Sequence, residues 1–443
     1  MRNAMSDVST NPRADLFRYV SLELDESSLR ATYELDGRAF VETVVFEGAG
    51  TLDRPVVRAV AELWFLVAGL SYYKAGAARR VDVGATPLGA AGERLLAAAL
   101  REGLGEFAYR NDLPLDDVII SGGTDVVATP VSLDPERVLV PFGGGIDSVV
   151  TTATLADHLD QTLFIVSPSS GPFAPLEETA AVTGLEIVRA TRHLDAQLLN
   201  DDDSFFHGHV PVTAMVTLLA AVAAVASGRG GVVMSNEHSA SAANLLWNDL
   251  EVNHQWSKSL AAEILIADAL SERLGDQLTV ASFLRDRSEV WVAKTFSELP
   301  QYHHVFRSCN RAFAQARERR LDTWCGECDK CLFINLMLAP FLSRATLVDI
   351  FHHEPLSDER RSDQLRVLVG VGVGVGVGVA YKPFECVGDP EESAAALRRV
   401  TELDQWRDEG QLAALAAEAN VAVTFESLLE QEGPSRVPAH WLR

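Results

Sequence analysis

The first third of the sequence contains two periodicities of apolar residues, one typical of strands and one typical of helices. Stretches in which apolar and polar residues alternate predict strands, and apolar residues three and four positions apart predict helices. The predicted strands are 17–24, 30–33 and 39–46, and the predicted helices are 59–75 and 90–104. This part of the sequence carries no motif that we associate with catalysis. We therefore expect residues 1–135 to form an α+β domain that serves recognition or packing.

From residue 136 onward, short continuous apolar runs replace the alternating pattern. Such runs are typical of strands that are buried on both faces. The predicted strands are 138–142, 163–167, 185–189 and 231–234, and the helices between them are 147–158, 175–183 and 214–226. Alternating strands and helices predict an α/β fold, in which helices cover both faces of a parallel sheet. Ligands of such sheets bind beyond the carboxyl ends of the strands.

The last hundred residues contain a segment of unusual composition. Valine and glycine alternate almost without interruption from residue 367 to 380. Glycine weakens a strand, so we interpret this segment as a repeat expansion without a function of its own. Residues 391–418 are predicted to be helical and residues 421–425 extended.

Composition narrows the functional classes. Hydrophobic residues make up 47% of the 443 residues, enough for sizeable buried cores, and the net charge of −24 argues against binding nucleic acid by phosphate neutralisation. The apolar run 214–226 is shorter than the roughly 20 residues that span a bilayer. The polar stretch 1–16 lacks the apolar segment of a secretory signal. We expect a cytoplasmic protein that acts on a small molecule, without a nucleic-acid or membrane partner.

A glycine-rich loop between the predicted strand 138–142 and the helix after it carries the first candidate chemistry. Glycine permits close approach of backbone N–H groups to phosphate oxygens, and the helix N-terminus adds further N–H groups and a positive dipole end. The serine hydroxyl could bind phosphate, and the aspartate could hold Mg²⁺ or cap the helix. A structural turn is the alternative interpretation, but strand, glycines, Asp-Ser pair and helix together favour ATP binding. The candidate nucleotide-binding residues are Gly143, Gly144, Gly145, Asp147 and Ser148.

A second polar segment follows the predicted strand 231–234, and therefore lies at the same edge of the sheet. Asn236 is a candidate for nucleotide binding, and Glu237 and His238 are candidates for catalysis. If residues 254–266 form a helix, His254 and Lys258 share one face of it and are further catalytic candidates. A solvated loop and a solvated His-Lys pair are the alternatives.

Four of the five cysteines are clustered in the sequence, whereas Cys386 stands alone. Four thiolates can close a tetrahedral zinc site, which would be structural because it leaves no open coordination position. An iron–sulfur cluster and a set of metal-free thiols are the alternatives. The candidate metal ligands are Cys309, Cys325, Cys328 and Cys331.

The loop 143–148 resembles the S-G-G-x-D-S loop of the PP-loop ATP pyrophosphatases, with Gly143 in place of the first serine. The resemblance implies an adenine nucleotide alpha hydrolase-like core. It also implies that the loop binds ATP with Mg²⁺ and that a substrate is adenylated with release of pyrophosphate. Adenylation converts a charged, unreactive carboxylate into a mixed anhydride with a good leaving group.

The order of several segments indicates one family within this superfamily. The loop 143–148, the segments 236–240 and 252–259, the cysteine run and the segment 382–388 follow one another over about 250 residues. This order, with the length and the extra N-terminal domain, is similar to the UDP-N-acetylmuramoyl-L-alanyl-L-glutamate epimerases of the MurL type. That resemblance implies an ATP-consuming isomerase of peptidoglycan precursor synthesis, and hence of cell wall biogenesis, cell shape and cell division.

The family resemblance also implies a mechanism and an organisation. The substrate would be UDP-MurNAc-L-Ala-L-Glu, whose glutamate α-carboxylate is adenylated so that a base removes the α-proton. The implied bases are His238, His254 and Lys258, with Glu237 orienting a partner or binding Mg²⁺. The expected units are the domain 1–135, a PP-loop domain 136–345 that includes the cysteine cluster, and a C-terminal region 346–443. A PP-loop ligase of the 7-cyano-7-deazaguanine synthase or amide-forming type and a non-catalytic nucleotide-binding module are the alternatives.

Overall fold

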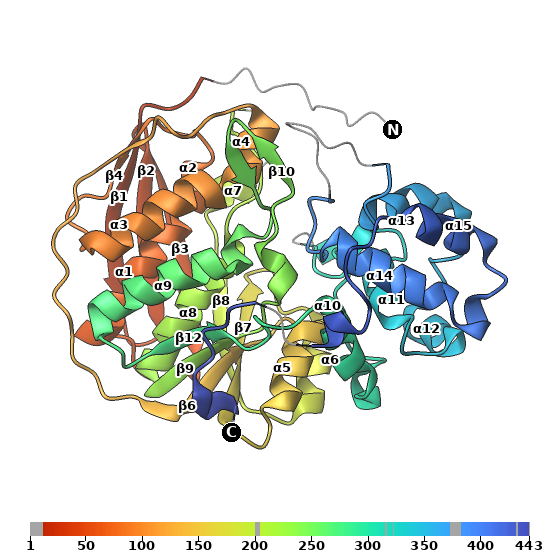
Figure 1. The fold of residues 1–443 in the computed structure, drawn as a ribbon. Coiled ribbons are helices and arrows are strands. Elements are labelled where there is room, and N and C mark those ends of the chain that lie inside the picture. The colour runs from red at the N-terminus through yellow and green to blue at the C-terminus, as the bar shows by residue number, and fades with distance from the viewer. Residues whose placement is uncertain are drawn as a thin grey trace.

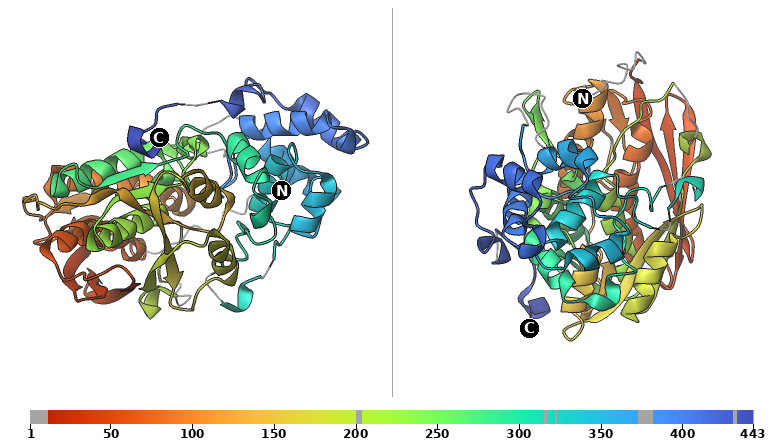
Figure 2. Two further views of the ribbon diagram at one scale, coloured as in Figure 1. Left: turned by 90° about the horizontal axis from the view of Figure 1, so that it is seen from below. Right: turned by 90° about the vertical axis from the view of Figure 1, so that its right-hand side faces the viewer.

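The computed structural model describes residues 12–199, 204–314, 317–321, 323–372, 382–430 and 433–442. The protein consists of a body built on a large sheet and a lobe of helices beside it (Figure 1). The N-terminal strands and the helical lobe lie at opposite ends of the molecule (Figure 2). The lobe contains α11 (Asp329–Leu338), α12 (Arg344–Phe351), α13 (Ser362–Leu368), α14 (Pro390–Thr401) and α15 (Gly410–Glu418).

The body is built on a ten-stranded sheet within the described residues, with strand order β12-β9-β6-β7-β8-β3-β2-β1-β4-β5. Strands β12, β9, β6, β7 and β8 pair in parallel, whereas β3, β2 and β1 pair antiparallel and join the parallel part at β8. The predicted α/β class, with a mostly parallel sheet and helices, is confirmed. The strands are β1 (Leu16–Leu24), β2 (Ser28–Leu35), β3 (Arg38–Glu47), β4 (Arg80–Asp82), β5 (Ile119–Ser121), β6 (Asp134–Pro141), β7 (Asp160–Pro168), β8 (Ile187–His193), β9 (Arg229–Met234) and β12 (Thr279–Ser282).

The order of the strands reverses at β6. From β6 the chain passes through α5 (Ile146–Thr154) to β7 and through α6 (Ala174–Thr183) to β8, whereas β9 and β12 lie on the other side of β6. Loops that follow neighbouring strands diverge at such a switch point, and open α/β sheets bind ligands there. The glycine loop follows β6 directly, so the fold places it at the position where a ligand is expected.

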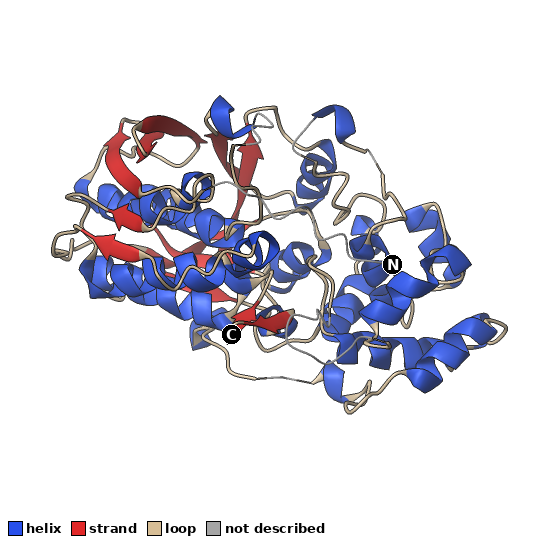
Figure 3. Ribbon diagram, turned by 90° about the horizontal axis from the view of Figure 1, so that it is seen from above, coloured by secondary structure: helices blue, strands red, loops and turns tan. Residues whose placement is uncertain are grey.

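Two large hydrophobic cores hold the helices, and a third, smaller one includes residues of β6, β9 and β12. One large core includes the buried faces of α1 (Pro55–Ala68), α3 (Gly89–Ala98), α8 (Val212–Ala226) and α9 (Leu260–Leu274). The other large core joins α5, α6 and α10 (Glu289–Ser297) to the helices of the lobe. Figure 3 shows the strands confined to the body and the lobe made of helices and loops. The three units expected from the sequence stay a prediction, although strands from the first two share this sheet.

One helical stretch, Pro55–Tyr73, is long and apolar enough to cross a membrane, but 83% of its most apolar window is buried inside the protein. It packs against α8, which is apolar on every side and is likewise buried. Burial of this kind is typical of core helices.

The C-terminal part differs from the sequence pattern in detail. The helix predicted over 391–418 is interrupted by a 3₁₀ turn, Asp404–Trp406, which separates α14 from α15. Residues 421–425 are not a strand. Of the Val-Gly segment, residues 367 and 368 end α13, and residues 373–380 lie outside the described residues.

Candidate active site

The glycine loop leaves hydrogen-bond donors available between β6 and α5. Gly144 has φ +73°, and a Cβ there would lie 3.3 Å from the Cα of Leu176, so this position requires glycine. Gly145 is the N-cap residue of α5 and has an extended backbone. Because glycine has no side chain, it cannot accept hydrogen bonds from the first N–H groups of the helix. No described atom lies within 4 Å of the place that a Cβ of Gly143 would take. The loop can therefore receive an anion.

Asp147 and Ser148 lie in the first turn of α5. The Ser148 hydroxyl donates to the Gly145 carbonyl at 3.1 Å, so it already faces the loop. Because Gly145 occupies the N-cap position, Asp147 does not cap the helix, which was one of its two expected roles. Its carboxyl group instead interacts electrostatically with Glu237, Lys330 and Lys258.

The loop after β9 lies beside the glycine loop because β9 and β6 are neighbouring parallel strands. Asn236 Nδ2 donates to Ser282 Oγ at 3.0 Å, at the end of the next strand, β12. The Glu237 side chain is buried and interacts electrostatically with Asp147. The fold thus brings Asp147 and Glu237 together at the carboxyl edge of the sheet.

Three carboxyl groups and two ammonium groups share this site. Burial and the nearby Glu237 carboxylate raise the pKa of Asp147 to about 6, although Lys330 and Lys258 oppose the shift. Burial together with Glu237 and Asp147 also raises the pKa of Glu289 well above its usual range. Burial opposes ionisation of Glu237 as well, but Lys258 and other donors and cations hold its pKa below the ordinary value. Carboxyl groups that suppress one another's ionisation in this way favour a cation between them.

His254 and Lys258 do not lie on one α-helix, because α9 begins only at Leu260, so the condition for their sharing a helix face is not met. Ser259 is the N-cap of α9, where its hydroxyl accepts a hydrogen bond from Ala262 N at 3.2 Å. Residues Trp256–Lys258 form a separate 3₁₀ turn. This cap ends the preceding turn, and the fold still directs both candidates to one residue, because His254 and Lys258 each interact with Cys386.

His254 lies between a carboxylate and a thiol. Its Nδ1 lies 2.5 Å from Glu106 Oε2, and its side chain also interacts with the Cys386 thiol. Burial alone would lower the pKa of His254, but the hydrogen bonds with Cys386 and Glu106 raise it to about 9. The imidazole therefore carries a positive charge near neutral pH.

His238 lines a cavity to which His254 does not contribute. It lines this cavity, of about 670 Å³, together with Trp256, Asn253 and Arg285. Its backbone N–H donates to the Arg287 carbonyl at 3.0 Å. The residues that line this cavity do not include Asp147, Glu237 or Glu289.

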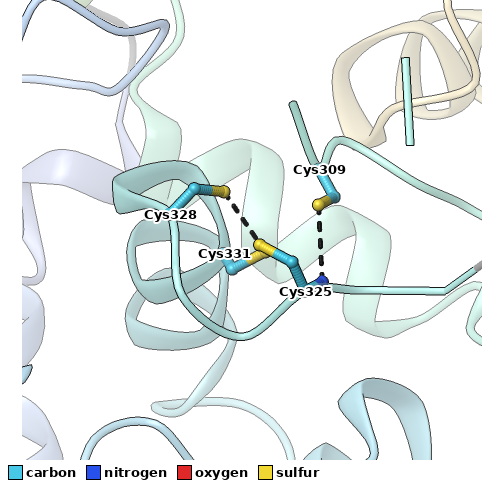
Figure 4. A group of neighbouring side chains, drawn as sticks. All are labelled: Cys309, Cys325, Cys328 and Cys331. Carbon is cyan, nitrogen blue, oxygen red and sulfur yellow. Dashed lines mark hydrogen bonds between the residues drawn. The ribbon is translucent and has the colours of Figure 1, made fainter. Parts of the chain in front are cut away.

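The four clustered cysteines converge on one point (Figure 4), where their sulfur atoms all lie within 4.8 Å of one another. Sγ of Cys331 lies 3.6 Å from that of Cys325 and 3.4 Å from that of Cys328, and Cys309 Sγ accepts a hydrogen bond from Cys325 N at 3.4 Å. Sulfurs around a tetrahedral zinc with Zn–S bonds of ~2.3 Å are ~3.8 Å apart. The donor set and its spacing therefore fit zinc.

The cysteine cluster also positions a charged residue of the site. Lys330 lies between two of the cysteines at the start of α11, and its backbone N–H donates to Glu385 Oε2 at 3.2 Å. Its ammonium group acts on Asp147 and Glu237. A change in the structure of the cysteine cluster would therefore move Lys330 and alter the charge balance at Asp147 and Glu237.

Four residues of this site were not among the candidates identified from sequence. Cys386 lies in the segment 382–388, which supported the family resemblance, and Lys330 lies inside the cysteine run. Both could therefore have been found from motifs already identified in the sequence. No local pattern distinguishes Glu106 or Glu289 from the many other acidic residues of the chain. These two become visible only through their buried partners.

Comparison with known proteins gives a consistent picture over almost the whole chain. The profile of the MurL N-terminal domain matches residues 8–283, and that of the MurL C-terminal domain matches residues 305–428. This chain is also similar to proteins named UDP-N-acetyl-alpha-D-muramoyl-L-alanyl-L-glutamate epimerase. One from a Micromonospora species is 37% identical over 96% of both chains, and one from Salinispora tropica is 37% identical over 91% of this chain and 88% of its own. A third, from Xanthomonas oryzae pv. oryzae, is 33% identical over 96% of both chains. No solved structure matches this chain.

Proposed function

The chain belongs to the MurL family, and from this we propose that it is an ATP-dependent epimerase of UDP-MurNAc-L-Ala-L-Glu. Its product is the D-glutamyl epimer, formed with AMP and pyrophosphate. The similarity to the named epimerases extends over nearly the whole of both chains, which favours an isomerase over a ligase or a nucleotide-binding module. The reaction belongs to cytoplasmic peptidoglycan precursor synthesis, and thereby to cell wall formation, cell shape and cell division.

One observation carries the ATP-dependent step: the open glycine loop lies at the reversal of strand order, beside the charged cluster. N–H groups of the loop and of the first turn of α5 bind the pyrophosphate end of ATP. The Ser148 hydroxyl, which now faces the loop, adds a donor, and Asn236 borders the nucleotide. A PP-loop architecture of this core is part of the proposal.

Asp147 and Glu237 are the residues that hold Mg²⁺ in this proposal. They fit the ion because their oxygens are hard ligands and because their mutual repulsion is relieved when a cation binds. When bound by these two carboxylates, the ion would supply positive charge against the phosphates of ATP. Lys258 and Lys330 lie in the same cluster and balance the remaining negative charge.

Adenylation prepares the glutamate for loss of its α-proton. The free α-carboxylate is negatively charged and resists formation of a second negative charge on the adjacent carbon. In the mixed anhydride this charge is gone, so the carbanion is stabilised as an enolate. Lys258 is poorly suited as the base. Burial opposes its charge, but Cys386, Glu237 and Asp147 raise its pKa, so it stays protonated and is suited to stabilise the enolate.

We assign the four cysteines to a structural zinc ion. Four protein sulfurs fill a tetrahedral shell and leave no position for substrate. The zinc would fix the turn that carries Lys330 and, through Glu385, the segment 382–388.

The test is an incubation with ATP, Mg²⁺ and UDP-MurNAc-L-Ala-L-Glu in D₂O. Pyrophosphate, AMP, the chirality of the glutamate and its α-deuterium content are measured together. The proposal predicts D-glutamate that carries deuterium, with AMP formed. Pyrophosphate release without inversion would contradict the epimerase assignment, and inversion without ATP would contradict the adenylation step.

A further inference from the structure

Cys386 is presented to the site by a segment that is fixed on both sides of it. Asn244 Nδ2 donates to the Pro383 carbonyl at 2.7 Å, and Gln255 Nε2 donates to the Val387 carbonyl at 3.0 Å. The segment 382–388 thus joins the loops after β9 to the helical lobe. Cys386 is only partly buried as a residue, so its segment is not closed off from the site.

The thiol is the end of a chain of three side chains. Glu106 Oε2 contacts His254 Nδ1, and His254 in turn interacts electrostatically with Cys386. Asn244 ties the two segments together, because it bonds both the His254 backbone N–H and the Pro383 carbonyl. The other carboxylate oxygen of Glu106 accepts a hydrogen bond from Arg110 Nε at 2.6 Å. Both oxygens of Glu106 are therefore engaged, and the imidazole is held in one orientation toward the thiol.

A metal ion is an alternative occupant of this place, because Glu106, His209 and His254 are close enough to share one. The guanidinium of Arg110 on the same carboxylate opposes a cation there. Burial and the nearby His254 lower the pKa of His209 to about 4, so that ring is neutral. A carboxylate–imidazolium–thiolate chain explains these contacts without a metal.

We propose that Cys386 is the acid–base residue that accepts the α-proton of the activated glutamate. In this step the C–H bond breaks, its electron pair moves into the activated carboxyl group to form the enolate, and the proton passes to Sγ of Cys386. The enolate takes a proton on its other face from an acid of the site, and the ammonium of Lys258 is a protonated group in the same cluster. Solvent exchange then returns both groups to their starting states.

The charges around the thiol support this assignment. Burial alone would raise the pKa of Cys386, but Lys258, His254 and Lys330 lower it to about 6. The carboxyl groups of Asp147 and Glu385 interact with it electrostatically and act in the opposite direction. A base with a pKa near the working pH is both ionised and able to bind a proton. Of the candidates named from sequence, His254 is already protonated, which suits it to hold the thiolate rather than to act as the base.

This inference rests on the proposed function, and its test separates the two. Cys386→Ala and Cys386→Ser are compared with the wild-type protein in D₂O with ATP, Mg²⁺ and the dipeptide substrate. Hydroxylamine is added to parallel samples to trap the activated carboxyl group. Both variants should still form hydroxamate and AMP, whereas α-deuterium incorporation should fall at least about 100-fold. Their melting temperatures check that the fold is intact.

Each outcome decides between the two proposals. If the wild-type protein forms no pyrophosphate, the proposed function falls and this inference falls with it. If Cys386→Ala keeps both pyrophosphate release and deuterium incorporation, only the inference is overturned. It is also overturned if acid-quenched wild-type protein carries the substrate as a thioester on Cys386, since the sulfur would then be a nucleophile.

A second measurement does not depend on turnover. The rate of iodoacetamide labelling of Cys386, followed by peptide mass spectrometry, should rise with a midpoint near pH 6. In Glu106→Gln the midpoint should move upward, because the imidazolium that holds the thiolate is weakened. A midpoint near 8.5 in the wild-type protein, the ordinary value of a free thiol, would overturn the inference.

Discussion

Alanine substitutions in the glycine loop separate its folding role from its binding role. At Gly144 the φ of +73° and the Leu176 Cα 3.3 Å from the new Cβ make alanine strained. The left-handed conformation costs about 1–2 kcal/mol for a residue with a Cβ, so the unbound Gly144→Ala protein should melt a few degrees lower. At Gly143 the space is open and φ is not positive. Gly143→Ala should therefore leave the melting temperature unchanged or slightly higher.

Gly143→Ala, which should not lower the melting temperature, should nevertheless weaken ATP binding. A Cβ on Gly143 occupies the space in which we place the phosphates, and it keeps at least one backbone N–H from reaching them. A hydrogen bond to a charged group contributes about 1.5–3 kcal/mol, so Kd for ATP should rise about 10- to 150-fold. Gly184→Ala is the matched control, since Gly184 has φ +68° and no described atom near its Cβ position, and it lies at the end of α6. It should lose stability and keep its ATP affinity.

The two measurements are differential scanning calorimetry of the unbound proteins and isothermal titration with ATP and Mg²⁺. If Gly143→Ala binds ATP as tightly as the wild-type protein, the loop does not hold the phosphates. If Gly184→Ala weakens ATP binding as much as Gly143→Ala, the loss at Gly143 cannot be assigned to the space in front of the loop.

Three further predictions concern the charged groups and the cysteines. The pKa of Asp147 is about 6 in the folded protein and ~3.9 in an unfolded chain, so folding binds a proton between these pH values. The free energy of unfolding should therefore fall as the pH rises from about 4 to 6. Asp147→Asn, or added Mg²⁺, should flatten this pH dependence in thermal melts, and an unchanged slope would contradict the assignment. Elemental analysis of the wild-type protein should find one zinc ion per chain. Cys328→Ser should lose this zinc and melt several degrees lower. A wild-type protein that is stable without metal would contradict the assignment. Glu106→Gln should lower the pKa of His254 from about 9, and an unchanged imidazole titration by NMR would show that Glu106 does not support its charge.

Features formed by consecutive residues were predictable from the sequence. The strand, the glycine loop and the helix that carries Asp147 and Ser148 follow one another without interruption, so local periodicity and glycine placement identify them. The cysteine cluster was predictable for a similar reason, because three of its members lie within seven residues.

Features that depend on distant pairing were not predictable. Local alternation predicts that residues 39–46 form a strand, but not that this strand pairs with β8 and extends the central sheet. Glu106 and Cys386 meet at His254 from positions far apart in the chain, and no spacing rule connects them. Whether a helix begins at residue 254 or later was left open by the sequence, and Ser259 decides it as the N-cap of α9, because helix boundaries depend on such single side chains.

The central claim is that the glutamate α-carboxylate is adenylated on the way to its epimer, and oxygen transfer tests it most directly. UDP-MurNAc-L-Ala-L-Glu labelled with ¹⁸O in both oxygens of the α-carboxylate is incubated with the protein, ATP and Mg²⁺, and AMP is analysed by mass spectrometry. The account predicts one ¹⁸O in each AMP, since the carboxylate oxygen that attacks the α-phosphorus stays on phosphorus when water attacks the acyl carbon. AMP without the label, formed alongside the D-epimer, would contradict it.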